Sequence, residues 1–266
     1  MKKQPIGVFD SGLGGLTILN ALRRELPQED LIYFGDTANV PYGSKSKTAV
    51  TKFSLAIARF LQSQGVKLII VACNTASAQA LAELRKQISV PVMGVIEPGA
   101  EKAVHTTRNG RVAVLGTEGT VKSRAYPKAL LKRRPGLHIT QQPCPLFVPL
   151  VEENWGQKPA AELIAREYLA PVKQSGADTV ILGCTHYPVL KPMLAAILGK
   201  KVTLVDSADT LAEAARAFLT EHGLAQTRGK GRVCIFASDD PARFKRLAGC
   251  LLAEKIGAVR LKKLTL

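Results

Sequence analysis

The chain has 266 residues, enough for about two ordinary domains, and 46% of them are hydrophobic, so a sizeable core can form. The formal net charge of +16 is typical of a nucleic-acid surface, but the basic residues lie in short scattered groups and only 5% of residues are aromatic, so stacking platforms for bases are not evident. Neither an apolar run of the roughly 18 residues that span a bilayer nor a signal peptide is visible, so we expect a cytoplasmic protein without membrane contact.

The first half of the chain alternates predicted strands and helices. In chain order, strands are expected at residues 6–10, 31–36, 68–72 and 92–97, and helices at residues 16–26, 48–64 and 76–88. This alternation predicts a parallel, doubly wound α/β sheet. In such sheets ligands bind outside the carboxyl ends of the strands, where Asp10, Asp36, Cys73 and Glu97 fall.

A glycine-rich turn, Ser11-Gly12-Leu13-Gly14-Gly15, follows the first strand. Turns of this kind can cradle phosphate, but the spacing matches neither a dinucleotide fingerprint nor a Walker loop with its lysine. The alternative use is a close approach of backbone N–H groups to a carboxylate, with Asp10 exposed at the strand end. The loop after the second strand, residues 37–44, is rich in turn residues and hydroxyls and suits either a surface turn or a binding loop.

Cys73 stands where a predicted strand ends and a helix begins. The N–H groups and the dipole of a helix start favour negative charge, so a thiol there can have a pKa of roughly 3.5–7.5 instead of about 8.5. A small buried core cysteine is the alternative interpretation. A second strand end of the same form, Gly183-Cys184-Thr185-His186, favours a chemical pair, because each cysteine is followed by polar side chains.

The second half repeats the pattern of the first. Three positions match in order, at offsets of 106, 111 and 109 residues: Ser11 with Thr117, Cys73 with Cys184, and Glu97 with Asp206. These matches indicate a duplication and two similar α/β units, with chance alignment of generic α/β segments as the alternative.

The other expected elements of the second half are strands near residues 112–116, 180–184, 202–206, 233–237 and 259, and helices at residues 159–174, 208–222 and 241–252. The proline-rich stretch 142–155 is predicted to be an irregular loop. Glu152 and Glu153 in this loop are either solvated charges or residues of a site.

Five cysteines, at positions 73, 144, 184, 234 and 250, form no CxxC pair, and this odd, scattered set indicates the reduced thiols of a cytoplasm. The same spacing argues against a disulfide oxidoreductase. A zinc site would need His and Cys ligands at short spacings, which the four histidines do not provide, so no metal is expected. A Cys–His hydrolase with Cys184 as nucleophile would explain His186 but leaves Cys73 without a role.

Two thiols that face each other from two domains can invert one stereocentre. One, as thiolate, takes a proton from carbon, and the other, as thiol, returns a proton from the opposite face. Asp10 and His186 would each tune the cysteine of their own half. The carbanion would be stabilised by N–H groups at helix starts and by hydroxyls at the turns, which are those of Ser11, Thr75, Thr117, Thr120 and Thr185. This chemistry does not require pyridoxal phosphate, so no cofactor is expected.

Five motifs resemble the signatures of glutamate racemase and occur in order: residues 7–16, Tyr33-Phe34-Gly35-Asp36, Pro41-Tyr42-Gly43, residues 72–76 and residues 182–188. The resemblance spans about residues 6–210 and implies cofactor-independent interconversion of L- and D-glutamate, which supplies D-glutamate for peptidoglycan and hence for cell-wall biogenesis and cell shape. It also implies that Cys73 and Cys184 are the two acid/base residues and that Glu152 helps near the second cysteine. The resemblance implies substrate contacts at Asp10, Ser11, Pro41, Tyr42, Gly43, Asn74, Thr75, Thr185 and His186. Thr117 and Thr120 are added to these contacts because their hydroxyls lie at predicted turns.

The family's fold has two α/β domains, and its C-terminal segment returns to the first, which accounts for about 60 residues left over after the two matched units. We therefore assign residues 1–96 and 208–266 to a first domain that carries Cys73, and residues 97–207 to a second that carries Cys184, with the active site between them. We expect a homodimer with glutamate as its small-molecule substrate.

Only five residues precede the first strand. Some members of the family have a longer N-terminal extension linked to activation by a peptidoglycan precursor, so we do not expect that regulation here. The alternatives are a racemase for aspartate or a hydantoin and, in a different class, a basic module that binds nucleic acid or gyrase with merely structural thiols.

Overall fold

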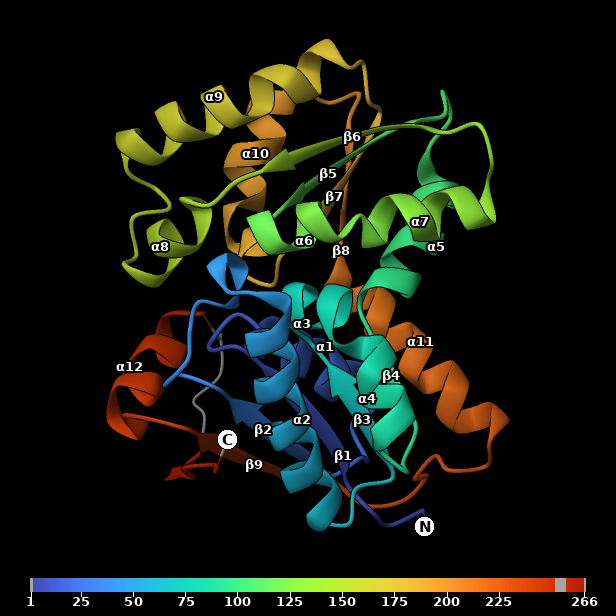
Figure 1. Cartoon of the computed structure of the whole chain (residues 1–266), viewed down its shortest axis with the longest axis vertical. Coiled ribbons are helices and arrows are strands. Elements are labelled where there is room, and N and C mark those ends of the chain that lie inside the picture. Colours follow the sequence, from blue (N-terminus) through green and yellow to red (C-terminus); the bar gives the residue numbers. More distant parts are fainter. Residues whose placement is uncertain (1, 252–256, 266) are drawn as a thin grey trace.

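Two parallel β-sheets organise the chain, and each forms the centre of one lobe (Figure 1). The computed structural model describes residues 2–251 and 257–265. The strand order is β10-β9-β2-β1-β3-β4 in the first sheet and β6-β5-β7-β8 in the second, and the paired strands run parallel. The predicted fold class, with two doubly wound parallel-sheet α/β units, is confirmed.

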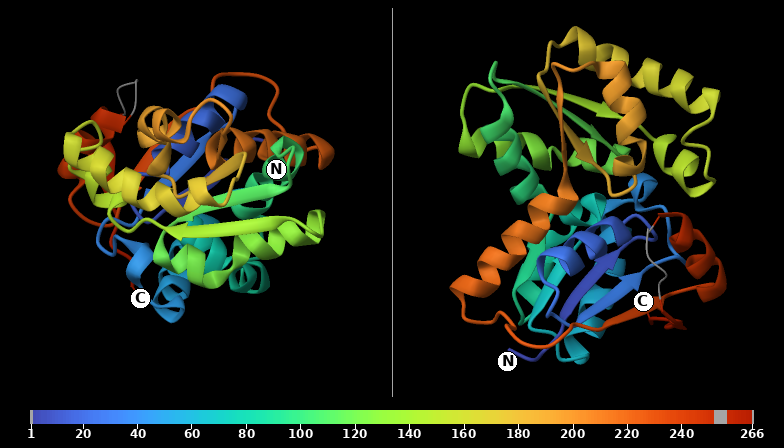
Figure 2. Two further views of the ribbon diagram at one scale, coloured as in Figure 1. Left: turned by 90° about the horizontal axis from the view of Figure 1, so that it is seen from above. Right: turned by 180° about the vertical axis from the view of Figure 1, so that it is seen from behind.

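Helices cover both sheets, and the chain visits the first lobe twice. The first sheet and its helices comprise β1 (Ile6–Asp10), α1 (Leu16–Glu25), β2 (Leu31–Gly35), η1 (Tyr42–Ser44), α2 (Lys47–Ser63), β3 (Leu68–Val71), α3 (Asn74–Gln79), α4 (Leu81–Gln87), β4 (Val92–Gly94), α11 (Ser207–Glu221), β9 (Val233–Ala237), α12 (Pro241–Leu251) and β10 (Val259–Leu261). The second comprises α5 (Ile96–Thr106), β5 (Arg111–Gly116), α6 (Glu118–Ser123), α7 (Ala125–Arg133), β6 (His138–Pro143), α8 (Phe147–Glu152), α9 (Pro159–Gln174), β7 (Thr179–Gly183), η2 (Tyr187–Leu190), α10 (Lys191–Leu198) and β8 (Thr203–Asp206). Helix α11 returns the chain to the first lobe, where it packs on α1 (Figure 2).

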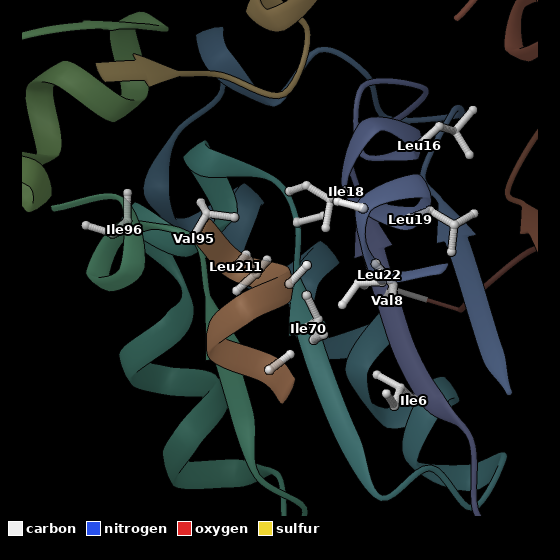
Figure 3. Close-up of a cluster of buried hydrophobic side chains, with 14 of the residues drawn as sticks. Ile6, Val8, Leu16, Ile18, Leu19, Leu22, Ile70, Val95, Ile96 and Leu211 are labelled. Atoms are coloured by element: carbon white, nitrogen blue, oxygen red, sulfur yellow. The ribbon is translucent and has the colours of Figure 1, made fainter. Parts of the chain in front are cut away.

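The core of the first lobe explains why α11 returns there. Val8 of β1 and Ile70 of β3 lie opposite each other in the parallel ladder, and both are fully buried beneath α1. Leu19 and Leu22 lie three residues apart, on one face of α1, and Leu211 of α11 joins the same cluster (Figure 3). Burying each such side chain stabilises the fold by about 1.5–3 kcal/mol.

The proline-rich stretch 142–155 is not the irregular loop that its composition predicts. Its start belongs to β6, which lies at the edge of the second sheet, where a terminal proline costs no ladder hydrogen bond. Its middle forms α8, and Pro149 lies in the first turn of that helix, where a missing N–H is tolerated. The prolines therefore lie where regular structure accepts them, and that prediction is wrong.

Several predicted elements of the described chain differ by one residue at an end, and two elements of the first half differ by more. β4 ends at Gly94 and α5 begins at Ile96, so Glu97 lies in the first turn of a helix instead of at the end of a strand. The single helix expected at 76–88 is divided at Ala80 into α3 and α4. The expected helix end at residue 252 and the side chain of Cys250 lie outside the described residues. None of the helices in the described ranges is both long and apolar enough to cross a bilayer.

Candidate active site

The carboxyl ends of the two sheets meet at one cavity of about 340 Å³ between the lobes. Both predicted acid/base cysteines line it, Cys73 after β3 of the first sheet and Cys184 after β7 of the second. The other predicted residues in the lining are Ser11, Pro41, Tyr42, Gly43, Asn74, Thr75, Thr117, Glu152, Thr185 and His186. Asp10 and Thr120 are fully buried and lie behind this lining. Both cysteines are free thiols, so one cavity brings together two sulfurs that are not bonded to each other.

Cys73 occupies the N-cap of α3. Its sulfur accepts a hydrogen bond from Ala76 N at 3.5 Å and lies 3.7 Å from Ser11 Oγ. Burial raises the pKa of Cys73 to about 12, and the Asp10 carboxylate adds to the rise, whereas the Ala76 N–H and the Ser11 hydroxyl oppose it. The lowered pKa expected from the helix start is therefore wrong. One N–H at the start of a six-residue helix does not offset the desolvation of a buried thiolate.

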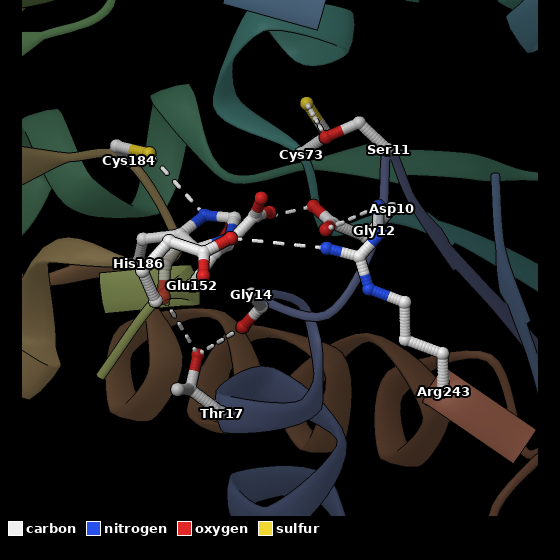
Figure 4. Close-up of polar contacts among 12 residues, drawn as sticks. Asp10, Ser11, Gly12, Gly14, Thr17, Cys73, Glu152, Cys184, His186 and Arg243 are labelled. Carbon is white, nitrogen blue, oxygen red and sulfur yellow. Dashed lines mark hydrogen bonds and ion pairs between the residues drawn. The ribbon is translucent and has the colours of Figure 1, made fainter. Parts of the chain in front are cut away.

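Asp10 is fully buried at the end of β1, so its expected exposure is wrong. Its Oδ2 accepts a hydrogen bond from Gly12 N at 3.0 Å, and its Oδ1 accepts one from Thr185 Oγ1 of the second lobe at 3.3 Å. Burial raises the pKa of the Asp10 carboxyl, and the nearby His186 acts in the opposite direction. Asp10 thus joins the two halves of the site beneath the cavity floor (Figure 4).

A chain of three side chains leads away from Cys184. Its sulfur lies 3.8 Å from His186 Nδ1, and His186 Nε2 lies 3.1 Å from Glu152 Oε1 of α8 (Figure 4). Burial alone would lower the pKa of His186, but hydrogen bonds with Cys184 and Glu152, together with the charges of Cys184 and Asp10, raise it to about 10. The imidazole is therefore a cation at neutral pH, next to the Cys184 sulfur and held by a carboxylate.

The glycine-rich turn serves the close approach of the two lobes. A Cβ on Gly14 would lie 2.3 Å from Thr185 Oγ1 and 2.6 Å from His186 Nδ1, so no side chain fits there. The Thr17 hydroxyl donates to Gly14 O at 2.8 Å and also lies 3.4 Å from Thr185 O (Figure 4). The turn therefore positions the segment that carries Thr185 and His186, a role that its sequence spacing did not reveal.

Hydroxyl and amide groups from both lobes complete the lining. Thr75 Oγ1 and Thr117 Oγ1 lie 2.8 Å apart, and Thr120 lies within hydrogen-bonding distance of both hydroxyls. Asn74 Oδ1 accepts a hydrogen bond from Tyr126 OH at 2.7 Å, but the Asn74 Nδ2 group is buried and has no partner. An unpaired buried amide costs roughly 1–3 kcal/mol, so a ligand with an acceptor oxygen would relieve that cost.

Asp36 supports the binding loop from outside the cavity. Its carboxylate accepts hydrogen bonds from Tyr42 OH at 2.5 Å and from Ser238 Oγ at 2.7 Å. The loop that follows β2 is thereby attached to the end of β9. Of the four strand-end residues expected at the site, Cys73 lines the cavity and Asp10 and Asp36 lie behind its lining, whereas Glu97 lies away from it and pairs with Arg133.

Sequence analysis missed part of the lining. Glu118 follows Thr117 directly, and its place one residue after a predicted strand-end hydroxyl was a usable signal. The other lining residues that were not predicted are Val40, Ser44 of η1, Pro145, and Val148 and Pro149 of α8. For Glu153 the prediction left open whether it is a solvated charge or a site residue. No lysine or arginine is among the described residues that line the cavity. In the same described ranges, no three His, Cys, Asp or Glu side chains are grouped so that they could hold a metal ion.

Comparison with known proteins gives consistent matches along the whole chain. Residues 16–215 match the family model Asp/Glu/Hydantoin racemase. A glutamate racemase of Geobacter metallireducens is 50% identical over 97% of this chain and 96% of its own. A glutamate racemase isoform of Bacillus anthracis has a crystal structure that superposes with a TM-score of 0.96 at 35% identity, covering 99% of this chain and 98% of its own. The glutamate racemase of Francisella tularensis, solved in complex with D-glutamate, gives a TM-score of 0.93 at 36% identity over 99% and 98% of the two chains.

Proposed function

The chain belongs to the Asp/Glu/Hydantoin racemase family, and we propose that it interconverts L-glutamate and D-glutamate without a cofactor, using Cys73 and Cys184 as the two acid/base residues. The observation that carries the proposal is the single cavity with one free thiol from each lobe. Inversion of a carbon centre by proton transfer needs an acceptor on one face and a donor on the other. Two thiols at the ends of two different sheets can occupy opposite faces.

The raised pKa of Cys73 and the position of His186 favour one starting form. The raised pKa of Cys73 keeps this thiol protonated, and His186 Nδ1 lies 3.8 Å from the Cys184 sulfur, so we assign the role of the first base to Cys184. In this form Cys184 takes the Cα proton of one enantiomer, and Cys73 gives its proton to the opposite face of the carbanion. The product form has a Cys73 thiolate and a Cys184 thiol, and it acts on the other enantiomer by the reverse steps. One proton enters and one leaves Cα, so the reaction balances.

Carbanion stabilisation must add to the typical 10²- to 10⁴-fold contribution of proton transfer. The cavity offers uncharged donors for this, because no lysine or arginine lines it. We assign the unpaired Asn74 Nδ2 group and the Ser11, Thr75, Thr117 and Thr185 hydroxyls to the substrate carboxylates. Donors fixed in a site that excludes water stabilise charge as it develops in the transition state.

Turnover in heavy water tests the function and the mechanism together. Incubation with either enantiomer of glutamate should place deuterium at Cα without added cofactor, while aspartate and a hydantoin should react more slowly. Cys73→Ala and Cys184→Ala should each lower the rate by at least about 100-fold. Cys234→Ala is the matched control, because Cys234 lies on β9 and not in the cavity lining. Racemisation that survives both active-site substitutions, or that needs pyridoxal phosphate, would refute the two-thiol mechanism.

We further propose that the product supplies D-glutamate for peptidoglycan and that the enzyme works in the cytoplasm, where both thiols stay reduced. Growth of a D-glutamate auxotroph that carries this chain is the test, with Cys73→Ala as the negative control.

We also propose a homodimer. Five large apolar side chains on the described part of the second lobe are at least 42% exposed, which favours a covered surface: Leu131, Leu146, Trp155, Leu163 and Val189. A monomeric mass in light scattering at micromolar concentration would refute the dimer.

A further inference from the structure

A second hollow, of about 610 Å³, adjoins the catalytic cavity at the junction of the lobes. It lies where the start of α2 and the helix α6 face each other across that junction (Figure 1). Gly43, Ser44 and Glu118 line both spaces, so the two share a wall.

Positive charge is concentrated in this hollow, which we name the lysine groove after Lys45, Lys47, Lys122 and Lys128. Lys45 lies between η1 and α2, and Lys47 is the first residue of α2. Lys122 lies in α6 and Lys128 in α7, so both lobes contribute. Glu118 is the only acidic residue among its described lining residues, and it lies 3.6 Å from Lys122 Nζ.

The catalytic cavity has the opposite charge balance. Three glutamates line it, Glu118, Glu152 and Glu153, and its described lining has no lysine or arginine, with His186 as the only basic side chain. Glutamate carries a net charge of about −1 at neutral pH, since two carboxylates outweigh one ammonium group. Each of these glutamates has a cationic partner, which is Lys122, His186 or Arg243, so the lining has no excess of positive charge to attract this substrate, and charges outside the lining can supply the attraction.

The shared wall is thin enough for the groove to act through it. A Cβ on Gly119 would lie 3.1 Å from Gly43 O, and a Cβ on Gly43 would lie 2.7 Å from Thr117 Cβ, so Gly119 and the Thr117 side chain of the second lobe pack closely against Gly43 of the first. Protein between charges screens less than water does, and a cleft with one sign of charge raises the local concentration of ions of the opposite sign.

We propose that the lysine groove sets the affinity of the catalytic cavity for its anionic substrate by supplying a positive potential that the cavity lining lacks. This inference rests on the proposed glutamate racemase activity. The potential acts equally on the bound substrate and on the transition state, so it changes KM and leaves kcat unchanged. Lys45, Lys47, Lys122 and Lys128 thus set the substrate affinity without touching the reacting atoms.

The test compares two variants with the same loss of four charges. One carries Lys45→Gln, Lys47→Gln, Lys122→Gln and Lys128→Gln. The matched control replaces with glutamine four exposed lysines in segments that precede β6, β7 and β8, at the end of the second sheet remote from the cavity: Lys132, Lys173, Lys200 and Lys201. Racemisation of L- and D-glutamate is measured at about 10 mM and about 0.5 M salt, where the Debye lengths are about 30 Å and about 4 Å.

At low salt the groove variant should have a KM about three- to tenfold above wild type with kcat within about twofold, and the control should match wild type. At high salt the difference should fall below about twofold, because screening removes the potential in both proteins. Equal KM values for the groove variant and the control at low salt would overturn the proposal. A lower kcat at unchanged KM would also overturn it, because that result would assign the lysines to the chemical step or to folding.

Calorimetric titration with glutarate separates this proposal from the proposed function. Glutarate carries both carboxylates but no amino-bearing carbon to racemise, so its binding reports the potential without turnover. The groove variant should bind glutarate about three- to tenfold more weakly than the control at low salt. Absent racemisation by wild type with this difference intact would refute the proposed function alone. Equal glutarate affinities of the groove variant and the control would refute the role of the lysine groove, whatever the turnover.

Discussion

Gly14→Ala should reduce catalysis although residue 14 carries no functional group. The new Cβ would lie 2.6 Å from His186 Nδ1, whereas ordinary contacts begin at 3.4 Å, so the imidazole or the turn must move by 0.8 Å. His186 Nδ1 is the atom that lies 3.8 Å from the Cys184 sulfur. A misplacement of about 1 Å can cost about 10² in rate. We therefore expect kcat/KM to fall about 100-fold, and equally in both directions, because the enantiomers have equal free energy.

Polarimetry on each enantiomer measures the loss of kcat/KM in Gly14→Ala. Urea unfolding measures the accompanying loss of stability, which should be about 1–3 kcal/mol because the added methyl group overpacks the site. Gly99→Ala in α5 is the control, since its Cβ would meet the Tyr126 hydroxyl at an ordinary 3.4 Å. A folded Gly14→Ala protein with activity within about threefold of wild type would show that the turn does not position His186.

Three further predictions concern buried polar groups. Lys67→Met should lower the free energy of unfolding in urea by about 3–5 kcal/mol, because it leaves Glu29 buried without its ion pair. The control Arg24→Met removes an exposed ion pair and should cost less than about 1 kcal/mol. Similar losses in the two variants would contradict this prediction. The pKa of His186 is raised to about 10, so its contribution to the free energy of unfolding is fully present below the unfolded-state pKa of about 6.5 and is lost as pH rises through 10. Urea unfolding at a series of pH values should show this fall in stability. An equally steep fall in His186→Asn would refute the role of His186. Asn74→Asp replaces the unpaired donor with an acceptor and should raise KM by at least about tenfold, so an unchanged KM would place the substrate carboxylate elsewhere.

The sequence by itself determined most of the local structure. The strands at residues 6–10 and 233–237 and the helix at 159–174 begin and end where they were predicted, because apolar runs, prolines and the residues at helix starts act within a few positions. The repeat of a strand end followed by a cysteine and polar residues pointed to both thiols. Parallel strands place their carboxyl ends at one edge of a sheet, so this local pattern was enough to expect Cys73 and Cys184 at strand ends that face a ligand.

Tertiary structure decided the electrostatics of the site. The burial of Asp10 and the raised pKa of Cys73 depend on what the second lobe covers, and no local pattern contains that information. The pairing of Glu152 with His186 depends on α8, in a stretch whose prolines predicted an irregular loop. A strand or helix is specified by neighbours in sequence, whereas desolvation and charge are set by neighbours in space. For that reason the cysteines could be found from the sequence, and the raised pKa of Cys73 could not.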